Sequence, residues 1–253
     1  MNKRIVSLTA VVIIIVTFSI MRIRLYGNPA LSIAGNDTQS YVKSSQVPLF
    51  SADILTGRRL LTTNLVYKLF EPKTGYQILV NGSLETRNRK LQPGFDRIAL
   101  LQLTFSILGW GMLAYFIAEN LQSTWTKILS VILILAFGYS PHIADWDSIL
   151  MSESLTFSLF ALQFALLIKM TFLIYRNPRA NITPWAVLWG VIYFLWTFLR
   201  DTNLFTSLMT LGMIIILFAI PAYRRNKTLT GSSIFLSLIF ILGFVTAEIS
   251  VRS

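Results

Sequence analysis

Long apolar stretches separated by shorter polar segments are the main feature of this chain. Runs such as IVSLTAVVIIIVTFSI and MTLGMIIILFAI contain no charged residue. Their lengths approach the roughly 20 apolar residues that a helix needs to cross a bilayer. The pattern therefore predicts about seven membrane-spanning helices, over residues 4–23, 97–118, 126–140, 149–173, 182–199, 204–222 and 231–250. The third of these is short and stops at Pro141, because proline does not continue a helix.

A long polar stretch, residues 24–96, separates the first two predicted spans and exceeds an ordinary connection. Within it, TGRRLLTTNLVYKLF alternates leucines with polar side chains at helical spacing, which predicts a short amphipathic helix on the membrane surface. The residues concerned are Leu60, Leu61, Leu65 and Leu69 with Arg58, Arg59, Thr63 and Lys68 between them. SYVKSSQVPLFSADIL predicts a second such helix, interrupted at Pro48. The segment EPKTGYQILVNGSLETRNRKLQPG has the composition of exposed turns.

The distribution of lysine and arginine predicts the orientation of the chain. One set of short segments is rich in these cations, and the opposite set, HIADWDS and RDTN, carries only Arg200. Cytoplasmic loops carry the excess of lysine and arginine, so the amino terminus is predicted to be cytoplasmic and the long first loop extracytoplasmic. The start MNKR resembles a signal peptide, but no small-residue cleavage site follows it, which predicts an uncleaved first helix. The cations on the cytoplasmic side are Lys3, Arg4, Lys127, Arg176, Arg179, Arg224, Arg225 and Lys227.

Composition agrees with an all-α, polytopic protein of the plasma membrane of a bacterium or an equivalent membrane. Hydrophobic residues make up 54% of the chain and charged residues 13%, whereas soluble domains carry about a quarter charged residues. The net charge of +11 would suggest nucleic acid in a soluble protein. Here the cations flank apolar spans, where they meet lipid head groups, so no nucleic-acid partner is predicted. The absence of cysteine and the single histidine, His142, exclude a disulfide framework, a thiolate nucleophile and a Cys- or His-based metal cluster.

Acidic residues gather on the predicted outer side, where they are candidates for chemistry. Asp37 follows the first span within GNDTQSY. Its carboxylate fits a general base that takes a proton from an attacking hydroxyl, although spacing alone favours a turn or helix cap. Asp147 fits a cap of the fourth helix as well as a site residue. Asp145 and Glu153 are eight residues apart and would share one face of a continuous helix, where Glu153 needs a partner.

Arg200, in FLRDTNLF, lies at the predicted outer boundary of a later span. A guanidinium there can grip a phosphate through two parallel hydrogen bonds. The alternatives are a side chain that reaches toward the head groups or a local pair with Asp201.

Taken together, three stretches resemble the membrane module of the GT-C glycosyltransferases, which include protein O-mannosyltransferases and bacterial enzymes that use polyprenyl-phosphate sugars. GNDTQSY is similar to the acidic motif after the first span of that superfamily. ADWDSILMSESLTFSL is similar to the start of its fourth helix, and FLRDTNLF to a basic motif on a later outer loop. The long first loop with two surface helices matches too. The likeness in order and topology covers nearly all of residues 1–253, which we interpret as one membrane module.

The resemblance implies an inverting glycosyltransferase that moves a sugar from a polyprenyl-phosphate donor to an acceptor hydroxyl of a glycan, lipid or protein. It implies that Asp37 acts as base or orients the acceptor, with Glu153 beside it as the second catalytic residue. It also implies that Arg200 holds the lipid-linked phosphate and that Asp145, Asp147 and Tyr41 help to bind substrate. No metal ligand is assigned, and the family leaves a divalent cation open.

The chain departs from the family in two ways. It stops at EISVRS, where relatives usually continue with further helices or a soluble domain, and its first motif has a single acidic residue where some relatives have two. Two alternatives therefore stand beside the enzyme: an accessory, catalytically silent relative that binds lipid-linked sugar or a partner enzyme, and a transporter or flippase. The transporter is less favoured because the acidic residues cluster at span ends rather than within spans.

Overall fold

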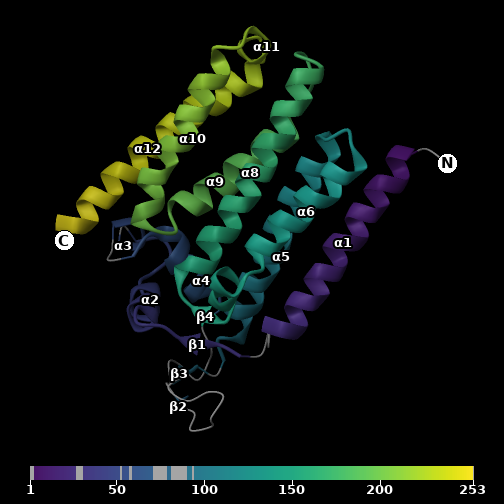
Figure 1. The fold of residues 1–253 in the computed structure, drawn as a ribbon. Coiled ribbons are helices and arrows are strands. Elements are labelled where there is room, and N and C mark those ends of the chain that lie inside the picture. Colours follow the sequence, from purple (N-terminus) through teal and green to yellow (C-terminus); the bar gives the residue numbers. More distant parts are fainter. Residues whose placement is uncertain are drawn as a thin grey trace.

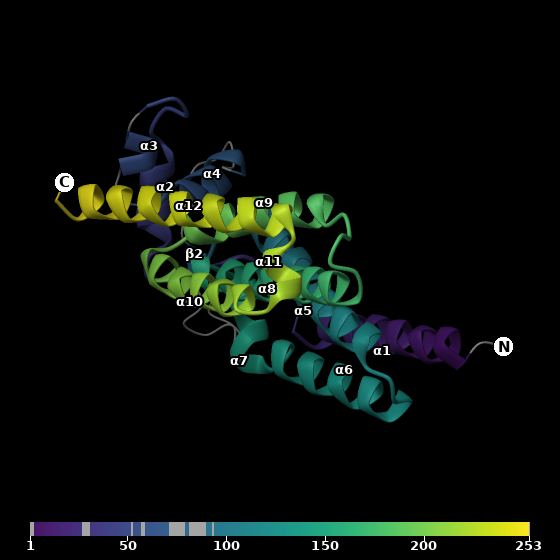
Figure 2. The ribbon, with the colours of Figure 1, turned by 90° about the horizontal axis from the view of Figure 1, so that it is seen from above.

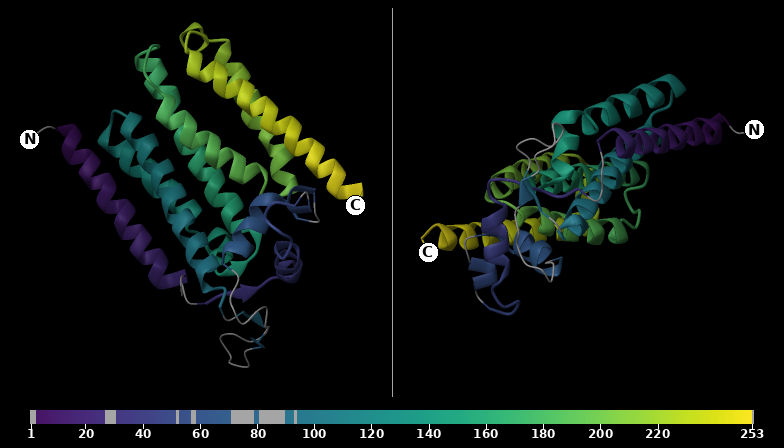
Figure 3. Two further views of the ribbon diagram at one scale, coloured as in Figure 1. Left: turned by 180° about the vertical axis from the view of Figure 1, so that it is seen from behind. Right: turned by 90° about the horizontal axis from the view of Figure 1, so that it is seen from below.

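The computed structural model describes residues 3–26, 31–51, 53–56, 59–70, 79–80, 90–92 and 94–252. It is an all-α bundle whose long helices run side by side (Figure 1). Views from above and from behind show α1 and α6 on one flank and α10 and α12 on the other (Figures 2 and 3). The long helices are α1 (Lys3–Tyr26), α5 (Asp96–Asn120), α6 (Thr124–Gly138), α8 (Ser152–Arg176), α9 (Thr183–Thr197), α10 (Asp201–Phe218) and α12 (Lys227–Arg252).

Within the described residues, five helices are long and apolar enough to cross a membrane, in keeping with a multi-pass integral membrane protein. A sixth span results if α6 is joined to the segment Pro141–Asp147, which is bent from it by 51°. Five or six of the roughly seven predicted spans therefore meet the length and hydropathy of a membrane-crossing helix. The difference is α9, whose 15 residues extend about 22 Å at 1.5 Å per residue, less than the roughly 30 Å of a bilayer core. The apolar run continues to Leu199, but the helix ends before it.

The centre of the bundle is the contact between α5 and α8, where the two backbones approach closely. A Cβ atom at Gly109 on α5 would lie 2.4 Å from the carbonyl oxygen of Ser158 on α8, so only glycine fits there. Small residues allow such close approach of membrane helices. Large buried side chains of α9, including Trp189 and Trp196, then fill the space between α8 and the last helices.

The first loop folds against one end of the bundle, which we call the loop end (Figure 1). It contains three short helices, α2 (Thr38–Ser45), α3 (Asp53–Thr56) and α4 (Leu61–Leu69), so the predicted surface helices form and are interrupted around Pro48. The other short helical segments are α7 (Pro141–Ala144), the 3₁₀ turn η1 (Asp145–Asp147) and α11 (Pro221–Arg224).

The α4 helix turns polar side chains toward the protein. Thr62, Thr63, Asn64 and Tyr67 are buried, whereas Leu69 is exposed. Two of these side chains donate to backbone carbonyls: Thr63 Oγ1 to the carbonyl of residue 199 at 2.7 Å, and Asn64 Nδ2 to that of residue 59 at 2.8 Å. This amphipathic helix is thus anchored through its polar face, which leaves Leu69 free to contact lipid.

A small sheet of two-residue strands joins the first loop to the start of α8. Its order is β2-β3-β1-β4 among the described residues, with Ile33 paired in parallel with Ile149 and antiparallel with Leu91. The stretch predicted to be turns thus contributes two strands, while most of that stretch lies outside the described residues. The strands are β1 (Ile33–Ala34), β2 (Leu79–Val80), β3 (Lys90–Leu91) and β4 (Ile149–Leu150).

Candidate functional site

A polar cavity of about 210 Å³ opens at the loop end, between α2, α4, the start of α8 and the turn between α9 and α10. Two hydrogen bonds position α2 beside α8. Thr38 Oγ1 accepts from the amide of Gly35 at 2.8 Å and donates to the carbonyl of Leu150 at 2.7 Å. The cavity is lined by Asp37, Tyr41, Arg59, Leu60, Thr63, Ser152, Leu199, Arg200, Asp201 and Thr202.

Asp37 faces this cavity and forms an ion pair with Arg59. Its Oδ1 lies 3.0 Å from the Nη2 of Arg59, and both side chains remain partly exposed. Asp37 occupies the N-cap position of α2, but its carboxylate makes no capping hydrogen bond. The capping interpretation is therefore wrong for this side chain, because the nearby guanidinium engages the carboxylate instead.

Arg59 is fixed by three further contacts. Its Nη2 and Nε donate to Ser40 Oγ at 2.6 and 3.0 Å. Its guanidinium carbon lies 4.5 Å from the centre of the Tyr41 ring, within the range of a cation–π contact. The guanidinium thereby lies over an aromatic ring while its Nη2 contacts Asp37.

Tyr41 joins the cavity floor to α8. Its hydroxyl lies 3.2 Å from Ser152 Oγ, and the residue is buried. Burial raises the pKa of the Tyr41 hydroxyl above its ordinary value of 10.0, an effect that the Ser152 hydrogen bond and the charge of Arg59 partly offset. The hydroxyl therefore stays protonated at neutral pH and acts as a neutral hydrogen-bonding group.

Arg200 and Glu153 form a second ion pair at the rim of the cavity. Nη1 of Arg200 donates to Oε1 of Glu153 at 2.7 Å. Arg200 precedes α10 in an extended conformation, and Glu153 lies in the first turn of α8. The other oxygen of Glu153, Oε2, is buried without a hydrogen-bond partner among the described residues. Glu153 thus has the partner that its position required. Arg200 pairs with Glu153 rather than with its neighbour Asp201.

A second cavity, of about 320 Å³, adjoins the first and shares Arg200 and Thr202 with it. Its walls combine polar groups near the ion pair with aromatic side chains along α8 and α9. Trp196 is fixed there by a hydrogen bond from its Nε1 to the carbonyl of Thr156 at 3.0 Å. The remaining lining residues are Glu153, Phe157, Phe160, Asn203 and Thr206. The two cavities together pair a charged recess with an apolar recess directly beside it.

Asp145 and Asp147 do not line either cavity. Asp147 is buried and binds Arg22 of α1, while it also accepts a hydrogen bond from Ser154 Oγ at 2.7 Å. Asp145 is exposed on η1. The continuous helix that would have placed Asp145 and Glu153 on one face does not form, because η1 and β4 lie between them.

Two arginines that the sequence analysis did not single out contribute to ion pairs. Arg59 was interpreted only as part of an amphipathic helix, and Arg22, inside the predicted first span, was assigned no role. The signal for Arg22 was its place within an apolar run, where a charge requires a partner. The signal for Arg59 was weaker, since the pair Arg58–Arg59 differs little from ordinary surface cations.

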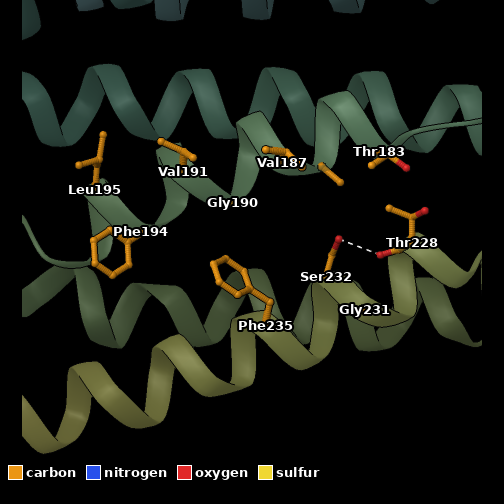
Figure 4. A pocket seen from close by; sticks show the side chains of 11 residues that line it. Thr183, Val187, Gly190, Val191, Phe194, Leu195, Thr228, Gly231, Ser232 and Phe235 are labelled. Carbon is orange, nitrogen blue, oxygen red and sulfur yellow. Dashed lines mark hydrogen bonds between the residues drawn. The ribbon is translucent and has the colours of Figure 1, made fainter.

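An apolar groove of about 540 Å³ lies between α9 and α12, toward the side of the bundle (Figure 4). Side chains such as Val187, Val191 and Phe235 face it, and Gly190 lines it without a side chain. Its polar groups are hydroxyls, one of which, Ser232 Oγ, donates to the carbonyl of Thr228 at 2.9 Å. Such a surface suits hydrocarbon and carries no reactive group.

No cluster of three or more His, Cys, Asp or Glu side chains in the described ranges is arranged to hold a metal ion. Comparison of the chain with protein-family models, with curated proteins and with solved structures finds no match.

Proposed function

We propose that the protein is an inverting glycosyltransferase that moves a sugar from a polyprenyl-phosphate donor to an acceptor hydroxyl. The observation that carries the proposal is the arrangement of Asp37, Arg59 and Arg200 around one cavity, next to the aromatic-walled cavity between α8 and α10. A lipid-linked sugar phosphate needs this combination: cations for its phosphate, a base for the acceptor, and an apolar surface for the hydrocarbon chain.

The reaction forms a bond between the acceptor oxygen and the anomeric carbon and breaks the bond from that carbon to the phosphate oxygen. The departing phosphate is already a good leaving group, so positive charge close to it is more useful than a strong acid. Arg200 would supply that charge, and attack from the opposite face would invert the anomeric carbon through an oxocarbenium-like state. The proton of the acceptor hydroxyl would pass to Asp37.

The ion pair between Asp37 and Arg59 adds a step to this scheme. A carboxylate that is held in an ion pair with a guanidinium is not free to contact an acceptor hydroxyl. Donor binding brings a phosphate that competes for Arg59. Release of Arg59 toward the phosphate would leave Asp37 free for the acceptor hydroxyl, which links donor binding to activation of the base.

The same ion pair is the observation that favours the second candidate, an accessory protein that binds lipid-linked sugar without turnover. There Arg59 keeps Asp37 occupied, and both side chains serve binding alone. The two candidates differ in what they predict for Asp37, since only the enzyme requires its carboxylate for rate.

The decisive experiment uses the purified full chain in phosphatidylcholine proteoliposomes with a panel of labelled polyprenyl-phosphate sugars and candidate acceptors. Transfer of label supports the enzyme, and Asp37→Asn is expected to lower the rate by at least about 100-fold, the usual contribution of a general base. The control is Asp53→Asn, an exposed aspartate on α3 outside the cavity, which should leave the rate unchanged. Binding of the donor with no transfer for any pair, or equal rates for both variants, would favour the accessory role.

The proposal places the loop end outside the cell and the amino terminus in the cytoplasm. The native chain has no cysteine, so a single engineered thiol reports its side of the membrane. In intact cells, Phe50→Cys should react with a membrane-impermeant maleimide, whereas Ser123→Cys at the opposite end should react only after permeabilisation. The reverse pattern would overturn the orientation.

A further inference from the structure

A second polar cavity, of about 800 Å³, lies at the opposite end of the bundle, where the chain begins. It is enclosed by the amino-terminal part of α1, the end of α5, the start of α6 and the end of α8. This cavity is separate from the loop end and shares no lining residue with either cavity there. The proposed transferase reaction makes no use of it.

The charges in this cavity are unbalanced. Lys127 is only 4% exposed, and its ammonium donates to the neutral Ser7 Oγ at 3.1 Å. No carboxylate in the described part of the chain lies within ion-pair distance of Lys127. Arg176 donates to the neutral Oδ1 of Asn120 at 2.8 Å, and the carboxylate of Glu119 is taken up by Lys169 at 2.8 Å. Glu119 also lines the cavity but is paired with Lys169, so Lys127 and Arg176 line it with no carboxylate partner among the described residues.

Burial of the charged Lys127 side chain is unfavourable for folding for two reasons. A buried charge is normally paired, because removal from water disfavours the charged form. Lys127 is also the fourth residue of α6, near the end of the helix whose dipole repels a cation. An anion in the cavity would relieve both costs at once.

We propose that this cavity binds a phosphate group, with Lys127 and Arg176 as the two cations that hold it. Lys127 supplies a desolvated point charge, and Arg176 supplies a planar fork that matches the oxygens of phosphate. Asn120 positions the guanidinium of Arg176: its Oδ1 accepts from Arg176, and its Nδ2 donates to the carbonyl of Phe116 at 2.7 Å. The exposed ring of Tyr175 and the side chain of Phe172 give the same cavity an apolar margin on α8. The phosphate belongs either to an anionic phospholipid head group or to a free phosphate ion.

The test measures thermal unfolding of the full chain in detergent micelles doped with phosphatidylcholine. In one arm phosphatidylglycerol replaces phosphatidylcholine stepwise, and in a second arm inorganic phosphate is added at constant ionic strength. A ligand that binds the folded state raises the unfolding temperature by mass action. Stabilisation in the first arm alone identifies a lipid head group, and stabilisation in the second identifies free phosphate.

Variants decide whether this cavity is responsible. Arg176→Gln and Lys127→Gln should each raise the midpoint of the stabilising titration at least about tenfold, as expected for a lost charge-assisted hydrogen bond. The matched control is Arg179→Gln, which removes an exposed cation of the neighbouring loop that does not line the cavity. Arg176 is exposed, so its variant gives the answer even where Lys127→Gln does not fold. The proposal is overturned if neither anion stabilises the protein, or if Arg176→Gln and Arg179→Gln shift the midpoint equally.

Discussion

The ion pair of Arg22 with Asp147 and the pair of Arg59 with Asp37 lie at the same end of the molecule but in different surroundings. The side chains of Arg22 and Asp147 are 1% and 8% exposed, whereas those of Arg59 and Asp37 are 26% and 46% exposed. Arg22 also lies 4.9 Å from the centre of the Tyr139 ring, so the first pair ties α1 to the segments after α6. The second pair has solvent on one side and faces a cavity.

The difference in exposure assigns the two pairs different roles. A sealed pair cannot exchange partners without leaving a charge buried alone, so it serves to hold helices together. A half-exposed pair contributes little to folding, since solvent screens both charges. Its members can turn to a ligand at small cost. An arginine–aspartate pair thus stabilises helix packing at Arg22 and Asp147, whereas the pair of Arg59 and Asp37 remains accessible to a ligand.

The largest effect is expected from Asp147→Asn, which tests the structural role of the buried pair. Removal of one partner from a buried pair is expected to lower the free energy of unfolding by about 3–5 kcal/mol, because the Arg22 charge is left uncompensated. Asp145→Asn, two residues away and exposed, should change it by no more than about 0.5 kcal/mol. Thermal unfolding of the detergent-purified variants measures both. Similar stability for the two variants would contradict a structural role of the buried pair.

Arg200→Ala tests whether the cavity at the loop end binds the phosphate of the donor. Loss of a charge-assisted contact to phosphate should weaken donor binding roughly tenfold to a hundredfold, the equivalent of about 1.5–3 kcal/mol. Stability should fall by about 1–3 kcal/mol, because the Glu153 side chain is only 13% exposed and loses its partner. Equilibrium binding of a polyprenyl phosphate gives the first value. Arg225→Ala, at the opposite end of the bundle, serves as control, and an equal loss there would remove Arg200 from the site.

Arg59→Lys separates charge from shape at the same cavity. The lysine keeps the positive charge but loses the flat contact with Tyr41 and the two hydrogen bonds to Ser40. We expect a fall of about fivefold in kcat/KM for transfer, close to 1 kcal/mol. The reverse exchange at exposed Lys43 on α2 should have no effect. A lysine variant as active as the native chain would show that charge alone suffices at this position.

The smallest expected effect belongs to Tyr41→Phe, which removes the contact between its hydroxyl and Ser152. The free energy of unfolding should fall by about 0.5–1.5 kcal/mol at neutral pH. Burial raises the pKa of this hydroxyl, so the unfolded chain releases the proton first as the pH rises. Native stability should therefore decline from about pH 10 upward, and the phenylalanine variant should lack this part of the decline. Parallel pH profiles for the two proteins would argue against a buried hydroxyl.

Much of the fold followed from local patterns. Hydrophobic run length located the long helices, because a helix in lipid satisfies its own backbone and needs only apolar side chains outside. Pro141 marked the break after α6, and Pro48 the gap between α2 and α3. The number of spans was harder to predict from the sequence. Hydrophobicity alone does not show that α9 ends at Thr197 although apolar residues continue to Leu199.

The candidate site was only partly visible in the sequence. Residues 37, 153 and 200 stood out as charges at the ends of apolar runs, and the structure brings Asp37 and Arg200 to one cavity with Glu153 bound to Arg200. Arg59 and Ser152 did not stand out, because serine and surface arginine are common. Their importance arises from neighbours that are distant in the chain.

That the chain is apolar and helical, with its charges in particular segments, follows from the sequence alone, since these properties depend on composition and on spacing along one helix. Which charged residues pair with each other depends on the tertiary structure. Asp37 and Asp147 are similar residues in similar polar segments, yet one faces a cavity and the other is sealed against Arg22. The energy of an ion pair depends on distance and on access of water, and both are set by packing between segments far apart in sequence.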